Sequence, residues 1–169
     1  MTSTCSESCM DVEMARLWAP WRSRFLTQRS RRRCFLCQAK SSHADRAHHV
    51  VARDRQAFAL LNRYPYNNGH LLVAPRRHVA GVEQLTAGEW EAMRRLSQRL
   101  MTRLNRTLRP QGYNVGMNLG RVAGAGVPGH LHLHLVPRWQ GDTNFMPVVG
   151  ATKVISQSLN ELYTLLRLD

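Results

Sequence analysis

Apolar residues recur at steps of three and four between residues 87 and 107, with arginines between them. These apolar positions are Trp90, Met93, Leu96, Leu100, Met101 and Leu104. This period puts the apolar side chains on one side of a helix. Thr86 and Glu89 have the spacing of a capping box in front of it, and Pro110-Gln111-Gly112 ends it. The pattern therefore predicts an amphipathic helix from about residue 87 to residue 107.

Shorter apolar runs separated by turn-forming residues predict strands. The expected strands cover residues 50–54, 57–61, 70–75, 113–119 and 130–136. A second capping box, Ser158 with Glu161, predicts a short C-terminal helix through Leu166. Hairpin-linked strands with helices gathered to one side indicate an α+β fold. We expect an antiparallel sheet of about five strands with one long helix and a C-terminal helix.

The chain divides into a short tail and one domain. Residues 1–15 are small and polar without periodicity, which predicts a disordered N-terminal tail. Residues 16–169 have the length and apolar content of a single domain that can bury its own core.

The charge of the chain is strongly positive, with a formal net charge of +13. Such a charge indicates an anionic partner, which could be a nucleotide, a nucleic acid or an acidic membrane surface. A solvated basic surface is the alternative reading. Arginines gather between residues 22 and 33 and again between residues 94 and 106, but no aromatic residues interleave with the Arg29–Arg33 run. A single-strand nucleic-acid binder needs such aromatics, so nucleic acid is the less favoured partner.

The sequence offers no membrane signal. No apolar run approaches the ~20 residues that span a bilayer, and polar residues interrupt the N-terminal region where a signal peptide would be apolar. We therefore expect a cytoplasmic protein that does not contact a membrane.

Three histidines alternate with leucines in His130-Leu131-His132-Leu133-His134. In a strand the histidines share one side, roughly 6.5 to 7 Å apart, and the leucines share the other. We expect the leucines to face the core and the histidines to face a cleft. Either the histidines supply a phosphorus nucleophile and a phosphate site, or they bind a metal. The glycine-rich loop 120–129 enters this strand, and its backbone N–H groups can approach a phosphate closely.

Cys34 and Cys37 form a C-x-x-C, which indicates either a metal site or a redox pair. No βαβ pattern surrounds Cys34, which disfavours a thioredoxin-like role. Two thiolates supply half of a tetrahedral zinc site. The candidates for the remaining ligands are His43, His48, His49, His78 and His130.

The sequence resembles the histidine-triad family. Residues 130–136 are similar to the motif that names it, and residues 58–65 with 69–75 are similar to its second signature. Residues 17–22 and 137–145 bring the chain closest to fragile-histidine-triad-like proteins and bacterial diadenosine tetraphosphate phosphorylases. The resemblance spans about residues 17–165.

The resemblance implies roles for individual residues. His132 matches the nucleophile, and His134 and His70 match positions that contact the phosphates and the leaving group. Asn62 matches a ribose contact, with an Asx turn as its structural alternative. The other expected substrate contacts are Asn118, Gly126, Val127 and Trp139. Trp139 is equally consistent with a packing or interface role.

Family members with a C-x-x-C imply a structural zinc site, which here would be formed by Cys34, Cys37, His78 and His130. The phosphorylase subgroup often lacks these cysteines, so their presence leaves open whether water or phosphate accepts the nucleotide. The resemblance also implies a homodimer, with Trp90 and Met93 suited either to its interface or to the core.

These observations lead to an expected function. We expect a nucleotidyl hydrolase or transferase that cleaves dinucleoside polyphosphates, of the diadenosine tetraphosphate type, through a nucleotidyl-histidine on His132. Hydrolysis of nucleoside phosphoramidates is the alternative activity. A non-catalytic, basic nucleotide- or nucleic-acid-binding module is the alternative from another class.

Overall fold

The computed structural model describes residues 34–150 and 152–168. The predicted tail, residues 1–15, and the arginine-rich stretch 22–33 lie outside the described residues. The elements in chain order are α2 (Phe35–Ser41), α3 (Asp45–His48), β1 (Val50–Arg53), β2 (Ala57–Leu61), β3 (Leu71–Pro75), the 3-10 turn η1 (Val82–Gln84), α4 (Ala87–Thr107), β4 (Gly112–Met117), β5 (Leu133–Arg138), α5 (Met146–Val149) and α6 (Leu159–Leu166).

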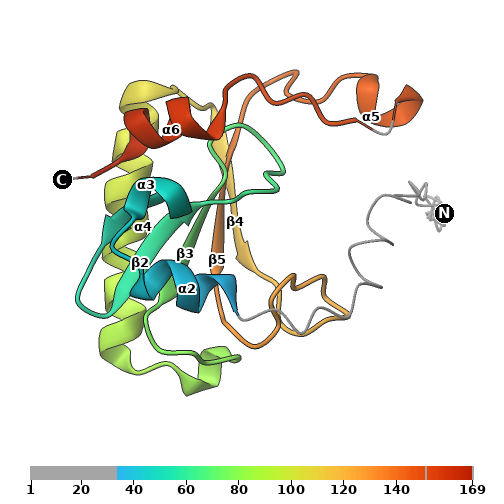
Figure 1. Cartoon of the computed structure of the whole chain (residues 1–169). Coiled ribbons are helices and arrows are strands. Elements are labelled where there is room, and N and C mark those ends of the chain that lie inside the picture. Colours follow the sequence, from blue (N-terminus) through green and yellow to red (C-terminus); the bar gives the residue numbers. More distant parts are fainter. Residues whose placement is uncertain (1–33, 151, 169) are drawn as a thin grey trace, which may run out of the picture.

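The strands form one antiparallel sheet in the order β1-β2-β3-β5-β4. Figure 1 shows the long helix α4 alongside the sheet and the short helix α5 on a connection that projects away from it. The predicted α+β class, the strand number and the two capped helices are confirmed. Among the described residues, no helix is long and apolar enough to cross a membrane.

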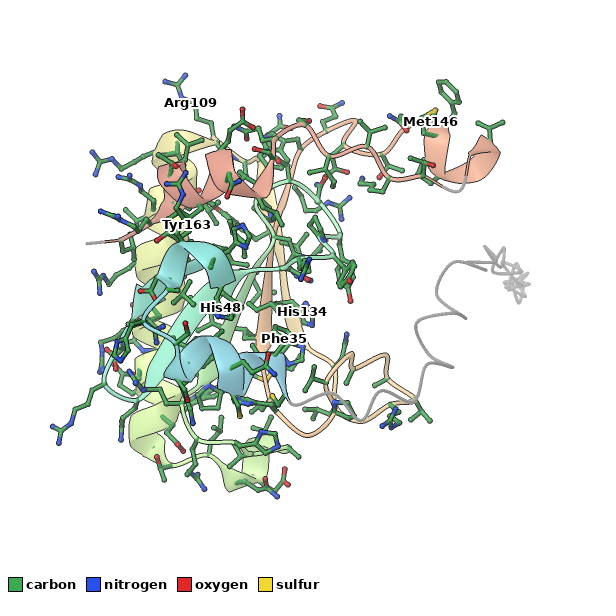
Figure 2. The ribbon with its side chains drawn as sticks, viewed as in Figure 1. Phe35, His48, Arg109, His134, Met146 and Tyr163 are labelled. Carbon is green, nitrogen blue, oxygen red and sulfur yellow. The ribbon has the colours of Figure 1, made fainter. Side chains whose placement is uncertain are left out.

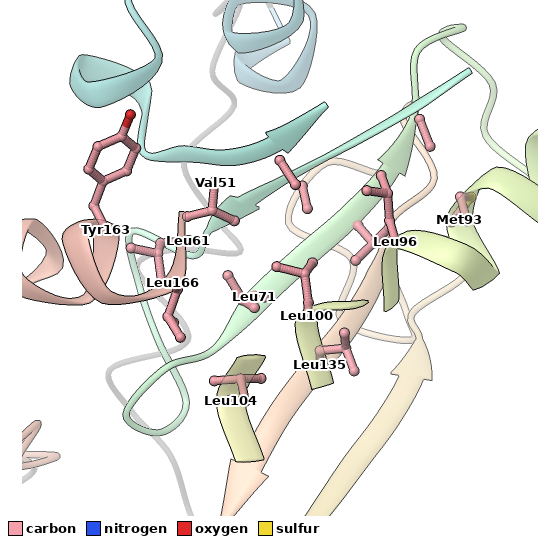
Figure 3. Packing of buried hydrophobic residues seen from close by; sticks show 14 of the residues in the cluster. Val51, Leu61, Leu71, Met93, Leu96, Leu100, Leu104, Leu135, Tyr163 and Leu166 are labelled. Carbon is pink, nitrogen blue, oxygen red and sulfur yellow. The ribbon is translucent and has the colours of Figure 1, made fainter. Parts of the chain in front are cut away.

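The main core lies between the sheet and the helices α4 and α6. Leu96, Leu100 and Leu104 of α4 are fully buried against Leu71 of β3 and Leu135 of β5, as Figure 3 shows. The apolar side predicted for α4 is the side that faces this core. Met93 belongs to it, whereas Trp90 stays about half exposed.

The opposite side of the sheet carries a smaller cluster formed with α2. Leu36 and Ala39 of α2 pack against Phe58 and Leu60 of β2 and Leu72 of β3. Leu72 is paired with His134 of β5. Directly paired residues of an antiparallel ladder project to the same side. His134 of β5 therefore faces the α2 side, and Leu133 and Leu135 face the main core.

The connection between β3 and α4 is fixed by an ion pair. Arg77 donates to both carboxylate oxygens of Glu89 at 2.9 and 2.8 Å. The Arg77 guanidinium lowers the pKa of Glu89 to about 2. Glu89 also accepts from the backbone N–H of Thr86 and so completes the capping box. This arrangement fixes the backbone beside His78.

The structure corrects the predicted extent of the histidine strand. β5 begins at Leu133, because its ladder with β3 ends at the pair Val73 and Leu133. Before that point, the backbone N–H of Leu131 donates to the carbonyl of Val79 at 2.6 Å, outside the sheet. His130 and His132 therefore precede the strand. The helices α2, α3 and α5 were not predicted.

Candidate functional site

His132 has the environment of a nucleophile. Its side chain is 6% exposed, and its Nδ1 lies 2.8 Å from the backbone carbonyl of His130. A carbonyl oxygen only accepts, so Nδ1 carries the proton and Nε2 presents its lone pair. Burial lowers the pKa of His132, which keeps the ring neutral near pH 7. Within the described part of the chain, its Nε2 makes no hydrogen bond.

His70 and His134 form a second pair of imidazoles, with Nε2 of His70 at 2.9 Å from Nδ1 of His134. The backbone N–H of Tyr66 donates to Nδ1 of His70 at 3.0 Å. A backbone amide is always a donor, so Nδ1 of a neutral His70 has no proton and its Nε2 has one. Nε2 of His70 must therefore donate to Nδ1 of His134. Because Nδ1 of His134 accepts this hydrogen bond, a neutral His134 carries its proton on Nε2.

That Nε2–H of His134 is the exceptional atom of the site. It is buried and has no hydrogen-bond partner among the described residues. The His134 ring lies 5.0 Å from the His132 ring between centroids. Burial lowers the pKa of His134 to about 4 and that of His70 to about 3. Both rings are thus neutral, and a donor without a partner lies beside the lone pair of the nucleophile.

The side chain of His130 belongs to a cluster of four potential metal ligands. Their donor atoms, on Cys34, Cys37, His78 and His130, all lie within 4.8 Å of one another. Sγ of Cys37 is 3.2 Å from Nδ1 of His78 and 3.4 Å from Nδ1 of His130, and the two Nδ1 atoms are 3.2 Å apart. A tetrahedral zinc with sulfur and nitrogen ligands has edges of about 3.3 to 3.8 Å. The donors therefore fit a zinc ion in both chemistry and size.

The same histidine joins this cluster to the candidate nucleophile. Nε2 of His130 lies 2.9 Å from the carbonyl of Pro75, so Nε2 carries the proton and Nδ1 is left as a ligand atom. The carbonyl of His130 accepts from His132. His130 is fully buried, and Phe58 of β2 packs against its ring.

The loop before His130 supplies unpaired backbone donors. Gly120 and Gly124 adopt positive φ, where glycine is favoured, and they turn the loop back on itself. The backbone N–H of Val127 and that of the exposed Gly126 make no hydrogen bond within the described residues. The loop ends where the carbonyl of Val127 accepts from His130.

Of two predicted polar contacts, one lies next to an imidazole and the other follows the neighbouring strand. Asn62 places its Nδ2 at 3.3 Å from Nδ1 of His70, while its Oδ1 accepts from the backbone N–H of Tyr64. The Asx turn is thus present, together with a contact to the site. Asn118 directly follows β4, whose last residue Met117 is paired with Leu133. Asn118 therefore comes directly after the end of the ladder at which His132 precedes β5.

The structure does not bring Trp139 to the imidazoles. Its indole N–H donates to the carbonyls of Leu108 and Arg109 at 3.3 and 3.2 Å, at the end of α4. Figure 2 shows Arg109 far from His134. The geometry matches the packing role of Trp139, and no described contact places its ring beside the nucleotide site.

Three residues of the site were missed from the sequence. The ring of Tyr66 is stacked on that of His134. Asn67, which is buried, donates through Nδ2 to Asp142 Oδ2 at 2.7 Å and to the carbonyl of Pro137 at 3.0 Å. Arg138 holds the pKa of Asp142 well below its usual range. The contacts of Asn67 join residues about 70 positions apart, and no local pattern signals them.

The arrangement is suited to attack on a phosphorus atom. It combines an oriented neutral imidazole, an adjacent N–H without a partner, and a loop with free backbone donors. Donors placed where charge develops stabilise the transition state most effectively in a site that excludes water.

Comparison with known proteins finds a matching family model, similar sequences and a similar solved structure. A family model described as HIT domain matches residues 44–141. The chain is 39% identical over 162 residues to AP-4-A phosphorylase of Mycobacterium tuberculosis, a match covering 91% of this chain and 83% of that protein. It is 34% identical over 86 residues to bis(5'-adenosyl)-triphosphatase of Dictyostelium discoideum, covering 51% of this chain and 57% of that one. A zinc-bound histidine triad family protein of Mycobacterium smegmatis has a similar structure, with a TM-score of 0.62, 25% identity and coverage of 79% and 90%.

The low pKa of His70 predicts a dependence of stability on pH. Between its ordinary value of 6.5 and its folded value of about 3, the unfolded chain binds a proton that the folded chain does not. The free energy of unfolding therefore falls as pH is lowered through this window. The variant His70→Gln removes this titrating group, while its amide keeps a donor toward His134. In this variant the slope of the unfolding free energy against pH should be smaller by about 1.4 kcal/mol per pH unit.

Urea unfolding of the wild type and His70→Gln at several values between pH 7 and about pH 4.5 measures the two slopes. Acid loss of any bound metal affects both proteins alike, so the difference isolates His70. Equal slopes would show that His70 is not held neutral by the fold.

Proposed function

The chain belongs to the HIT domain family, and on this premise we propose that it cleaves the phosphoanhydride of a dinucleoside polyphosphate such as diadenosine tetraphosphate. The observation that carries the proposal is the buried, unpartnered Nε2–H of His134 next to the oriented ring of His132. The relatives named AP-4-A phosphorylase and bis(5'-adenosyl)-triphosphatase support this substrate class.

In the first step, Nε2 of His132 attacks the phosphorus next to one nucleoside. The P–N bond forms, the bridging P–O bond breaks, and its electron pair leaves on the oxygen of the nucleoside polyphosphate. The ring of His132 becomes cationic, and its Nδ1–H bond to the His130 carbonyl strengthens with that charge. Nε2–H of His134 donates to the leaving oxygen and keeps its proton, since the ring is neutral.

In the second step, an oxygen of water or of inorganic phosphate attacks the same phosphorus. The P–N bond breaks, its electron pair returns to His132, and the proton of the acceptor passes to solvent. Water gives a nucleoside monophosphate and phosphate gives a nucleoside diphosphate. The backbone donors of Gly126 and Val127 serve the phosphoryl oxygens, and Asn62 and Asn118 serve the sugar and the phosphate.

Cys34, Cys37, His78 and His130 would hold a structural zinc. A bound zinc supplies four fixed bonds that join α2, the turn after β3 and His130. This chain's own groups do the rest, because Pro75 orients the His130 ring and the His130 carbonyl orients His132.

Two copies of the chain would form a dimer through β4. This strand lies at the edge of the sheet, and Val115 on it is 52% exposed. Unpaired edge strands with exposed apolar side chains are ready sites for pairing with another chain. Trp90, also exposed, lies on α4.

Replacement of the nucleophile gives the first test. His132→Ala should lower kcat for diadenosine tetraphosphate by about a thousandfold or more, while circular dichroism stays unchanged. His48→Ala, on α3, is the matched control. Product analysis with and without inorganic phosphate distinguishes ADP plus ATP from AMP plus ATP. Full activity in His132→Ala contradicts the mechanism, and turnover of adenosine phosphoramidate alone contradicts the substrate class.

Metal analysis gives the second test. The purified protein should contain one zinc per chain, and His78→Ala should lose most of it, since three ligands hold zinc far more weakly than four. His43→Ala, an exposed histidine outside the cluster, should retain zinc. Absence of zinc from the wild type, or equal retention in both variants, would exclude this ligand set.

The oligomeric state gives the third test. Light scattering should report about twice the chain mass of 19.3 kDa. Val115→Asp should halve the measured mass. A carboxylate at this edge would lose its hydration on pairing and would be repelled by the same carboxylate of the second copy. Val154→Asp is matched at the same 52% exposure and lies outside β4. A monomeric wild type, or equal masses in the two variants, contradicts the β4 interface.

A further inference from the structure

Tyr66 lies on the loop between β2 and β3, and its ring covers one face of His134. The two rings are nearly parallel, at an angle of 11° and with centroids 5.5 Å apart. The Tyr66 ring also lies 4.7 Å from that of His70. The side chain is nevertheless 47% exposed, so much of its surface contributes no burial to the fold.

The loop that carries Tyr66 is fixed at this residue and at the positions that follow it. The backbone N–H of Tyr66 itself donates to His70. The next side chain, Asn67, is buried and joins the loop to Pro137 and Asp142. Gly69 has a φ of +71°, and a Cβ there would lie 2.9 Å from Leu108 Cδ1. The stacked position of the Tyr66 ring is therefore built into the loop.

His134 needs such support because its hydrogen bonds fix only one end of its ring. Nδ1 accepts from His70, while Nε2 has no partner among the described residues. The attachment at Cγ and the bond at Nδ1 lie at the same end of the ring, so the far end, which carries Nε2, is the less restrained. A flat contact against a second ring restrains this far end as well.

We propose that Tyr66 is a positioning residue for departure of the leaving group: its ring holds His134 in the plane that directs Nε2–H at the bridging oxygen. The inference rests on the proposed function. As the P–O bond breaks and its electron pair moves to the leaving oxygen, His134 donates a hydrogen bond without losing its proton. Because the His134 ring is neutral, the strength of its hydrogen bond to the leaving oxygen depends on the direction of the N–H group. A tilted ring would therefore donate a weaker hydrogen bond.

Aryl esters of AMP test this role, because the need for a donor at the leaving oxygen depends on the leaving group. Phenol is a poor leaving group and 2,4-dinitrophenol is a good one. The value of kcat/KM reports the step in which the aryl group departs. We would compare both esters in the wild type, Tyr66→Ala, Tyr66→Phe and, as control on the same loop, Tyr64→Ala.

Tyr66→Ala should lower kcat/KM for the phenyl ester by about tenfold, less than the 10² to 10³ that follows complete loss of a donor. The dinitrophenyl ester should change by less than about twofold, since its leaving oxygen needs little stabilisation. Tyr66→Phe keeps the ring and should match the wild type with both esters, as should Tyr64→Ala. Nitrogen NMR should show the Nε2–H form of His134 in both variants, because the backbone N–H of residue 66 is kept, whereas nitrogen relaxation should show a larger motion of the His134 ring in Tyr66→Ala than in Tyr66→Phe.

The inference is overturned if Tyr66→Ala lowers kcat/KM equally for both esters, changes it for neither, or leaves the motion of the His134 ring as in Tyr66→Phe. It is also overturned if Tyr66→Phe loses as much as Tyr66→Ala, since that result would assign the effect to the hydroxyl. The proposed function is judged separately in the same assay. If the wild type cleaves both esters and His132→Ala cleaves neither, the function stands whatever the Tyr66 variants do.

Discussion

The hydrogen bond between Nδ1 of His132 and the carbonyl of His130 is the interaction on which the site depends. It fixes which nitrogen of the His132 ring carries the proton, and so makes the other nitrogen a nucleophile. The carbonyl itself is held in place because the His130 ring is buried, bonded to Pro75 and part of the Cys34, Cys37 and His78 cluster. His130 thus joins a cluster that could hold a metal ion to the proposed nucleophile, His132. The two readings of the histidine motif that the sequence left open are therefore combined, with different histidines in each role.

The second constraint is a chain of donors that ends at the leaving group. It runs from the backbone of Tyr66 through His70 to His134, and each member sets the tautomer of the next. The loop that starts this chain is held by Asn67 on Asp142, whose carboxylate also binds Arg138 and the backbone of Trp139. Burial keeps the imidazoles neutral. The site consequently works through fixed N–H donors and one lone pair, without an added proton.

Local patterns predicted what depends on local interactions. The spacing of Leu96, Leu100 and Leu104 and the Thr86 capping box predicted α4 with its observed bounds. The alternation around His134 predicted which side faces the core. The strand start was wrong, because Leu131 bonds to Val79 rather than to a neighbouring strand. The helix α2 was missed, since Cys34 at its N-cap makes no side-chain cap. The contacts of Tyr66, Asn67 and Asp142 depend on the tertiary fold, and the composition of their segments does not signal them. The zinc ligand set came from family resemblance, because spacing alone left five histidines open.

The central claim is that His132 is covalently nucleotidylated during turnover. Base-quenched mixing of the protein with diadenosine tetraphosphate, followed by mass spectrometry of the proteolytic peptides without exposure to acid, tests this claim directly, since the P–N bond survives base and hydrolyses in acid. We expect one adenylyl group on the peptide containing residues 130–134, and fragmentation should assign it to His132. Turnover without any adenylylated peptide, or with the group on His70, His134 or another side chain, would contradict the account.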